Sequence, residues 1–275
     1  DQLGGAVVNM PVVSALGPLW EDKAAANLQD KIAAVTKDSR ITVYLNATMA
    51  KLEGQPGEYT AVIKTPDGEK TEPIGTVILA TGWVPLDGKY LEPMGLGKSS
   101  KVVTAAEFGM MLKSNSVNVK RVAFVLDTTM AEEAAAKQQE EEAKQAEAEK
   151  AAEKSAEEGE DKSYVKTDLE CINHLKYSNA VNSIGMLRLA NTVCEQSDDA
   201  TQAFILYKNM TVPGIFERFY KKMQDRLGVM MTKADVTDIR EVGDHMVVEC
   251  KNTLLGEDFD LDVDLVVLPT GLVPT

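Results

Sequence analysis

Two short motifs of the same form could bring the chain backbone against a cofactor. The first is Val77–Pro85, VILATGWVP, and the second is Val266–Pro274, VVLPTGLVP. Each runs from apolar residues into a Thr-Gly pair and ends at a proline. Glycine has no Cβ, so a ligand can approach the backbone closely, and the proline stops the strand. The pattern is typical of a buried strand that ends at a cofactor, and it predicts binding by backbone rather than a catalytic side chain.

The repetition of the motif indicates related units. Gly82 and Gly271 are 271 − 82 = 189 residues apart. A single copy is weak evidence, because many buried strands end in glycine and bind nothing. Two copies, each after strands rich in Asp, Glu and Thr, suggest two dinucleotide-binding units, or one such unit with another inserted.

Composition limits the classes of partner and site. The formal net charge of −14 over 275 residues disfavours nucleic acid and anionic membrane surfaces as direct partners. No apolar run has the length of a membrane span. Cys171, Cys194 and Cys250 are odd in number and scattered, which fits buried or free thiols in a reducing compartment. Without a C-x-x-C pair or a Cys/His cluster, we expect no metal or iron–sulfur site.

The elements before the first motif are expected to be one helix and several strands. Leu28, Ile32 and Val35 have helical spacing and predict a helix over Glu21–Thr36. Alternation and turn residues predict strands at Ile41–Leu45, Thr48–Glu53, Tyr59–Lys64 and Thr76–Ala80. The last of these strands carries the first Thr-Gly pair.

The elements after the first motif follow a different order. Leu86–Lys101 is expected to be a loop, and Thr104 and Glu107 form a capping box that opens a helix. Further helices are expected at Asn173–Gln196 and Gly214–Leu227, and strands at Val119–Leu126, Phe204–Tyr207, Val229–Thr232, Val236–Val242, His245–Lys251, Phe259–Val263 and Leu265–Leu268. Strand, helix, strand, helix and then a run of strands is the order of a Rossmann-type unit with antiparallel crossover strands.

The strand Val119–Leu126 lacks the turn that a dinucleotide site normally has. A glycine-rich turn should open a helix that holds the pyrophosphate, but Asp127–Met130 contains no glycine and begins with a carboxylate that would repel phosphate. Ala131–Lys162 follows, with twelve acidic residues, five lysines and nothing larger than alanine to form an apolar seam. We expect this insertion to be exposed and mobile, partly helical or disordered. Docking to a partner is the alternative.

These residues resemble the heterodisulfide reductase A subunit family of two-dinucleotide-binding-domain flavoproteins. The resemblance is carried by Leu3-Gly4-Gly5, VILATGWVP, the Thr-x-x-Glu helix, RVAFVL, FERFYKKMQDRLGVMMTKADVTDI and VVLPTGLVP. Among its relatives, the chain is most similar to the A and B flavin subunits, B more than A, of the quinone-interacting membrane-bound oxidoreductase (Qmo) complex of sulfate reducers. Cysteines that heterodisulfide reductase A carries in the second unit are absent from residues 125–128 and 177–182, which favours the Qmo-like side.

The resemblance implies an α/β fold with two dinucleotide-binding domains, in truncated form. Residues 1–118 would be the remainder of an FAD-binding domain, whose first strand and G-x-G-x-x-G turn are expected before Asp1. Residues 119–130 with 163–275 would form a second, NAD-type Rossmann-like domain, and residues 131–162 its mobile insertion. The intact subunit would bind FAD, whereas this fragment would bind it weakly or not at all.

The resemblance also assigns cofactor-binding roles. Gly82 would let the ribityl or pyrophosphate part of FAD approach the backbone, and the backbone of Met49 would meet the adenine. The full set of expected FAD contacts is Gly4, Gly5, Met49, Thr81, Gly82, Trp83, Thr270, Gly271, Leu272 and Val273. A plain strand-end turn, or for Met49 a plain strand residue, is the alternative. His174 and His245 are given no chemical role. Cys171 and Cys194 could be redox thiols, but their separation and helical context favour buried packing cysteines.

The implied function is electron transfer by a flavoprotein subunit between protein partners. In the Qmo complex these would be the quinone pool and adenylylsulfate reductase. The protein would be cytoplasmic, held at the membrane by a membrane-bound partner subunit, and without nucleic acid. Two alternatives remain: an NAD(P)H-dependent flavin reductase of the pyridine nucleotide-disulfide oxidoreductase type, which Asp127–Met130 disfavours, and a non-catalytic scaffold. The fragment alone is expected to be inactive.

Overall fold

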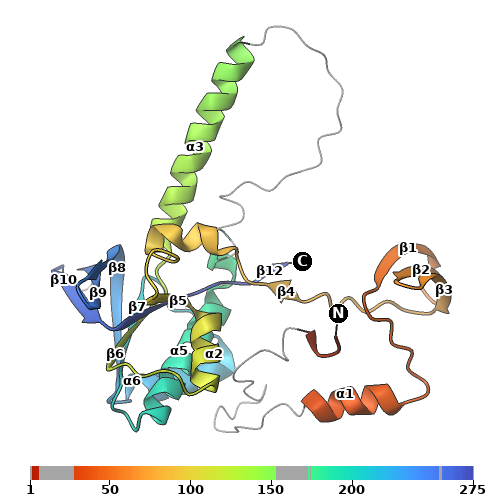
Figure 1. Cartoon of the computed structure of the whole chain (residues 1–275), viewed down its shortest axis with the longest axis horizontal. Helices are drawn as coiled ribbons and strands as arrows, with labels where there is room; N and C mark the ends of the chain where they lie inside the picture. Colours follow the sequence, from red (N-terminus) through yellow and green to blue (C-terminus); the bar gives the residue numbers. More distant parts are fainter. Residues whose placement is uncertain (1, 6–27, 153–172, 174, 254–255, 275) are drawn as a thin grey trace. The chain divides into compact units, whose positions relative to one another are not determined.

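The computed structural model describes residues 2–5, 28–152, 173, 175–253 and 256–274 (Figure 1). The chain divides into two compact units: Asp1–Gly82 with Pro274–Thr275, called unit 1, and Trp83–Val273, called unit 2. The sequence placed the boundary at residue 118 instead. The difference arises because residues 83–118 supply a strand that pairs with the sheet of unit 2 and side chains, such as Leu91, that are fully buried in its core.

Unit 1 contains one helix and one small sheet. Helix α1 (Leu28–Lys37) is followed by the antiparallel strands β1 (Thr48–Gln55), β2 (Glu58–Thr65) and β3 (Gly68–Ile74), in the order β1-β2-β3. The β1–β2 turn needs a glycine at position 54, where φ is 107° and a Cβ would lie 2.2 Å from the carbonyl oxygen of Glu58. The Tyr44 hydroxyl donates to Glu72 on β3 at 2.6 Å, which ties the preceding loop to the sheet.

Two segments of unit 1 that were expected to be strands are not. Ile41–Leu45 and Thr76–Ala80 are irregular, and most of their apolar side chains are exposed, including Ile78 at 86% and Leu79 at 79%. A strand is stable only when its backbone groups pair with a neighbour. Within the part of unit 1 that the structure describes, neither segment has a strand partner. Both strand predictions were therefore wrong.

Unit 2 is built on a seven-stranded mixed sheet in the order β10-β9-β8-β7-β6-β11-β5. Its strands are β5 (Val102–Thr104), β6 (Arg121–Val125), β7 (Gln202–Tyr207), β8 (Val229–Val242), β9 (His245–Asn252), β10 (Asp258–Val263) and β11 (Leu265–Leu268). The five from β5 to β8 are parallel, and β8, β9 and β10 are antiparallel. This is the expected α/β Rossmann-type arrangement with antiparallel crossover strands, and that prediction is confirmed.

Strand β8 belongs to both halves of this sheet. Its first part, as far as Lys233, pairs in parallel with β7, and its second part, from Ala234, pairs with β9 in the antiparallel direction. A register shift between Val236 and Asp238 marks a bulge near the change of partner. The sequence predicted two separate strands here, because the bulge interrupts the alternation of apolar residues.

Unit 2 also contains α-helices and 3₁₀ helices. They are η2 (Gly88–Met94), α2 (Ala105–Lys113), α3 (Thr129–Ala152), α5 (Asn179–Gln196), η3 (Gly214–Phe216) and α6 (Glu217–Gln224). The capping box of α2 is confirmed: the Glu107 N–H donates to the Thr104 hydroxyl at 3.2 Å, and the Thr104 N–H donates to the Glu107 carboxylate at 2.7 Å. Phe108 of α2 meets Phe124 of β6 edge to face, with ring centroids 5.4 Å apart. The 3₁₀ helix η2 replaces the predicted loop.

Helix α3 begins before the expected insertion and is anchored in the core. It starts at Thr129, and Ala131 and Ala135 are 1% and 6% exposed in the same cluster as Met94 of η2. The sequence predicted no docking face after Ala131, and this is wrong for the first two turns, since alanines permit close approach without large side chains. Residues 153–162 lie outside the described part of the chain, so the mobility of the insertion stays a prediction. None of the described helices is both long enough and apolar enough to cross a membrane.

Candidate functional site

The carboxyl edge of the parallel strands is where unit 2 could hold a ligand. In the strand order, β7 and β8 lie to one side of β6, and β11 lies to the other side of β6. In open parallel sheets, ligands bind outside the carboxyl ends of the strands at such a reversal of strand order. The residues that leave β6 and β11 here are Leu126-Asp127 and Pro269-Thr270-Gly271. The second Thr-Gly turn therefore lies at the edge where a ligand is expected.

The second Thr-Gly turn is held from two directions. Gly271 is buried with φ at 61°, a conformation that favours glycine. The Leu86 N–H donates to the Thr270 carbonyl at 2.8 Å, and the Leu272 N–H donates to the Ser178 hydroxyl at 2.8 Å. Ser178 is only 5% exposed. The turn is thus fixed in place before any ligand is present.

Ser178 was missed by the sequence analysis. The sequence was interpreted as one continuous helix over Asn173–Gln196, but a turn at Ser178 separates helical residues 175–177 from α5. A Ser-Asn pair inside a helical pattern is the signal that could have revealed it, since both residue types favour helix ends.

The last residues of the two motifs pair with each other. Strand β4 (Trp83–Val84) forms a two-stranded sheet with β12 (Val273–Pro274). Two of the predicted cofactor residues, Trp83 and Val273, thereby lie in one two-stranded sheet. The sequence showed the motifs to be similar but gave no reason to expect that their ends pair.

Unit 1 contains an apolar groove beside the first motif. The groove has a volume of about 390 Å³ and is lined by Tyr44, Ala47, Thr48, Met49, Ala61, Ile63, Ile74, Thr76, Val77 and Ile78. Its volume is within the usual range for small-molecule sites. Met49, which the family position assigned to the adenine, thus shares a groove with the apolar run of the first motif.

The other predicted residues of unit 1 do not line this groove. Gly82 has φ at 78°, and a Cβ added to it would meet no heavy atom within 4 Å, so its backbone is open to a ligand. Thr81 beside it is exposed. Gly4 and Gly5 lie in a short turn near the start of the chain and are not among the groove-lining residues. Because the two Thr-Gly turns belong to different units, their joint contact with one flavin stays a prediction.

Asp127 lies at the carboxyl end of β6, where a glycine turn would stand in a nucleotide site. Its side chain is 2% exposed. One carboxylate oxygen accepts the Thr129 N–H at 3.1 Å and the Thr129 hydroxyl at 2.7 Å. The other oxygen accepts the Val236 N–H at 2.8 Å. The carboxylate is therefore buried and bonded to the first turn of α3 and to the bulge of β8.

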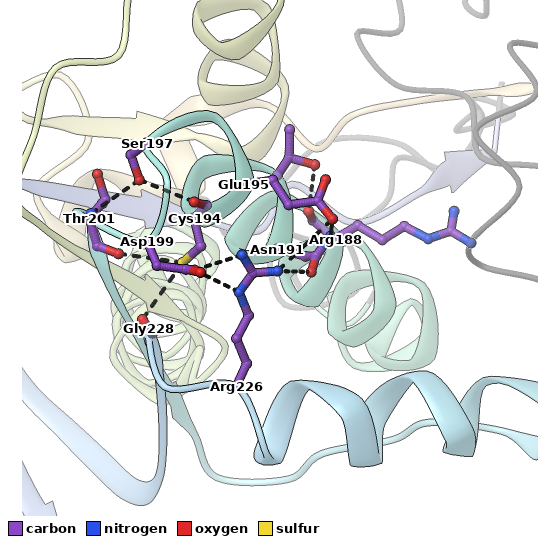
Figure 2. A network of polar contacts seen from close by, with 10 residues as sticks. Arg188, Asn191, Cys194, Glu195, Ser197, Asp199, Thr201, Arg226 and Gly228 are labelled. Atoms are coloured by element: carbon purple, nitrogen blue, oxygen red, sulfur yellow. Dashed lines mark hydrogen bonds and ion pairs between the residues drawn. The ribbon is translucent and has the colours of Figure 1, made fainter.

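A polar network at the opposite, amino edge of the sheet is structural (Figure 2). The Arg226 guanidinium donates to Asp199 at 2.6 Å and to the side-chain oxygen of Asn191 at 2.7 Å. The Cys194 thiol lies inside this network and donates to the Thr201 carbonyl at 3.4 Å. The network ties the end of α5 to the starts of β7 and β8, and it lies away from the ligand edge.

The described cysteines are poorly suited to redox chemistry. Cys194 and Cys250 are both free and buried. Burial raises the pKa of the Cys194 thiol, and burial together with the charges of Asp127 and Asp260 raises the pKa of Cys250 to about 12. Thiols with raised pKa values are weak nucleophiles. Cys171 and His174 lie outside the described residues, and among those that are described, no cluster of His, Cys, Asp and Glu could hold a metal ion.

His245 lies on the antiparallel part of the sheet, far from the candidate edge in the strand order. It is partly exposed and lies 3.3 Å from Asp244 and 3.6 Å from Asp262. The structure brings no predicted cofactor residue to it. It thus has no contact that would indicate a chemical role.

Comparison with known proteins supports the resemblance seen in the sequence. No family model matches the chain. The A subunit of the H(2):CoB-CoM heterodisulfide,ferredoxin reductase of Methanothermobacter thermautotrophicus is 25% identical over 215 residues, which are 73% of this chain and 27% of that protein. The iron-sulfur A subunit of the CoB–CoM heterodisulfide reductase of Methanocaldococcus jannaschii is 32% identical over 93 residues, or 32% of this chain and 14% of that protein. The chain thus spans about a quarter or less of the length of these relatives.

Solved structures with some similarity include two thioredoxin reductases. That of T. acidophilum is 15% identical with a TM-score of 0.43, and that of Lactococcus lactis is 10% identical with a TM-score of 0.45. Each alignment covers 99% of this chain and 67% of the other.

Proposed function

We propose that this chain, whose curated homologues are heterodisulfide reductase A subunits, is part of a flavin-containing electron-transfer subunit. The observation that carries the proposal is the similarity to those subunits over 73% of the chain. The Rossmann-type sheet of unit 2, with a fixed Thr-Gly turn at its ligand edge, agrees with it. The finer assignment, a subunit like the A or B flavin subunit of the Qmo complex, is part of the proposal.

FAD is the cofactor that we propose for these residues. The groove beside Met49 would take the adenine, and the open backbone at Gly82 would face the ribityl or pyrophosphate part. Thr81, Trp83 and the turn Thr270–Val273 would complete the contacts, with Gly4 and Gly5 near the flavin in the intact subunit. The flavin would supply one- and two-electron chemistry, while the protein supplies binding and electrostatics.

The residues of the chain provide binding surfaces rather than proton transfer. Two buried polar side chains at the candidate edge, Ser178 and Asp127, have hydrogen bonds within the protein. Neither is placed to exchange protons with a substrate. The chain would therefore orient the flavin and exclude water, and electrons would pass to and from it through partner proteins.

Partner subunits and location follow from the same proposal. The subunit would belong to a multi-subunit complex that includes a membrane-bound member, and would lie on the cytoplasmic side. In a Qmo-like complex it would connect the quinone pool and adenylylsulfate reductase. The alternatives are an NAD(P)H-dependent flavin reductase and a scaffold without redox activity. The buried Asp127 at the nucleotide position disfavours the first of these.

Titration of the intact subunit with FAD and then with NADH would separate the three functions. We expect one FAD in each intact subunit, with no NADH binding in the micromolar range. Binding of NADH with a low micromolar dissociation constant, lost on substitution within Asp127–Met130, would favour the reductase. An intact subunit that binds no FAD would favour the scaffold.

The 275-residue chain is the matched control for this titration. We expect it to purify colourless and to bind FAD weakly or not at all. A yellow preparation with stoichiometric FAD would show that the groove and the Thr-Gly turns suffice for binding.

A further inference from the structure

The buried carboxylate of Asp127 occupies the place where a dinucleotide-binding unit holds the anionic part of its ligand. We infer that Asp127 acts as an internal anion that closes unit 2 to nucleotides, and that it is therefore a specificity-determining residue. The exclusion of nucleotides by Asp127 would explain why electrons enter the subunit through protein partners and not from NADH. This inference rests on the proposed function. If the Asp127 carboxylate itself blocks the site, its removal should allow a phosphate to bind in unit 2. If only the absence of a glycine turn prevents binding, its removal should have no such effect.

The position of Asp127 is the first support. It follows β6 directly, at the carboxyl edge of the parallel strands β6 and β11. Thr129, whose N–H it accepts, is the first residue of the 24-residue helix α3. The N-terminus of a long helix carries about half a positive charge and free N–H groups, which is why it binds phosphate. Here a carboxylate of the chain itself takes that position.

The number of donors that meet at Asp127 is the second support. Two groups of Thr129 and the N–H of Val236 all donate to the one carboxylate. Strand β7 ends at Tyr207, opposite Lys233, so β8 has no neighbour on that side at Val236. The Asp127 carboxylate supplies the acceptor that the missing strand would have supplied. A buried N–H without an acceptor is costly, so these donors need an anion or another acceptor in this place.

The two lysines near Asp127 are already paired with other carboxylates. The Lys208 ammonium donates to the Thr129 hydroxyl at 3.1 Å and lies 3.6 Å from Asp235. The Thr128 hydroxyl donates to Glu132 at 2.9 Å, and Lys176 lies 2.8 Å from the same Glu132 carboxylate. Asp127 is thus the buried anion among paired charges at the start of α3. An incoming phosphate would have to displace it.

The test is to replace Asp127 and supply an anion from solution. In the 275-residue chain, Asp127→Gly removes the carboxylate and allows close approach to the backbone. The thermal midpoint is measured with and without 10 mM sodium pyrophosphate, with sodium chloride added to equal ionic strength. We expect pyrophosphate to raise the midpoint of Asp127→Gly by roughly 3 °C or more, the size that mass action gives for ligand far above its dissociation constant. The wild type should move by less than about 1 °C.

Asp264→Gly is the matched control. Asp264 lies at the amino end of the same strand region and accepts the N–H groups of Lys120 and Arg121 at 2.7 and 2.9 Å. Removal of the Asp264 carboxylate also leaves two backbone N–H groups without their acceptor, but no helix begins at Asp264. We expect Asp264→Gly to be destabilised and to gain nothing from pyrophosphate beyond the wild type.

Three outcomes would overturn the inference: a wild type stabilised by pyrophosphate as strongly as Asp127→Gly, equal gains in Asp127→Gly and Asp264→Gly, or no gain in either. If Asp127→Gly does not fold, Asp127→Ser keeps a hydroxyl acceptor for Thr129 and is measured in the same way. NADH binding by the intact wild-type subunit would contradict the proposed function. Absence of NADH binding together with absence of pyrophosphate rescue would contradict only the role of Asp127.

Discussion

Two nearly identical sequences in this protein have opposite environments. In Val77–Gly82 the apolar residues Ile78 and Leu79 are 86% and 79% exposed, and the backbone is irregular. In Val266–Gly271 the corresponding residues, Val267 and Leu268, are both 0% exposed and lie in β11.

The difference comes from neighbours rather than from the motifs. Strand β11 lies between β6 and β5, which come from residues more than 130 positions earlier in the chain. Residues 77–80 have no such neighbours among the described parts of unit 1. The same local preference therefore gives a core strand in one place and an exposed segment in the other.

The largest expected effect comes from the same substitution in both copies. Leu268→Ala should lower the free energy of unfolding by about 2–5 kcal/mol, because it removes a fully buried side chain and leaves a cavity. Leu79→Ala should change it by no more than about 0.5 kcal/mol, since Leu79 is largely exposed. Urea unfolding of both variants measures the difference. Equal costs would show that residues 77–80 are packed in solution, and the contrast between the copies would then be lost.

The next effect tests whether the buried copy depends on the network at the amino edge of its sheet. A Cβ at Gly228 would lie 3.2 Å from an Asp199 carboxylate oxygen and 3.3 Å from the Cys194 sulfur. Gly228→Ala should therefore destabilise unit 2 by about 1–3 kcal/mol.

Gly185→Ala is the control for this substitution. It lies in α5, where an added Cβ would meet nothing within 4 Å, and it should stabilise the helix by about 0.4–1 kcal/mol. A neutral Gly228→Ala in thermal unfolding would contradict the importance of close packing in the network.

A smaller effect is expected at the turn that ends the buried copy. Ser178→Ala removes the acceptor of the Leu272 N–H and should cost about 1 kcal/mol. Faster hydrogen exchange at the Leu272 amide would identify the turn as the place of the loss. Ser116→Ala, at the exposed end of α2, is the control and should leave that amide unchanged. Unchanged exchange in Ser178→Ala would show that the turn is held by other contacts.

The smallest effect concerns the charge pair beside β5, the strand that flanks the buried copy. The Lys101 ammonium, 2.7 Å from Glu241, holds the pKa of that carboxyl below its usual value. A carboxyl whose pKa is lowered by folding stabilises the protein above its unfolded pKa, roughly 4.3, and this contribution is lost as pH falls below that value. The pair is exposed, so the change should be slight.

Lys101→Gln should therefore lose less stability than the wild type when the pH is lowered from 6 to 3. The exposed Lys98 gives the control variant, Lys98→Gln, which should keep the acid dependence of the wild type. Acid titration of the unfolding midpoint compares the three proteins. An acid dependence identical in all of them would exclude a contribution of the pair.

The sequence predicted the local elements of unit 2 well. Capping residues and periodicity fixed α2 and the strands β6, β7, β9, β10 and β11, because these signals act within a few residues. They also indicated the Rossmann-type order. Of the candidate site, the sequence located both Thr-Gly turns and the absence of a glycine turn at Asp127–Met130.

Only the tertiary structure decided what those local elements contact. The pairing of β4 with β12, the clamp from Ser178 to Leu272 and the bond from Asp127 to Val236 join residues between 94 and 190 positions apart. Such contacts depend on how separate strands and helices come together, and a local pattern carries no information about them. The sequence by itself determined that both copies of the motif, at Val77–Gly82 and Val266–Gly271, could form an apolar strand. Only the second copy lies between two strands, β5 and β6, with which its backbone can form hydrogen bonds. For that reason only the second copy became part of a sheet core.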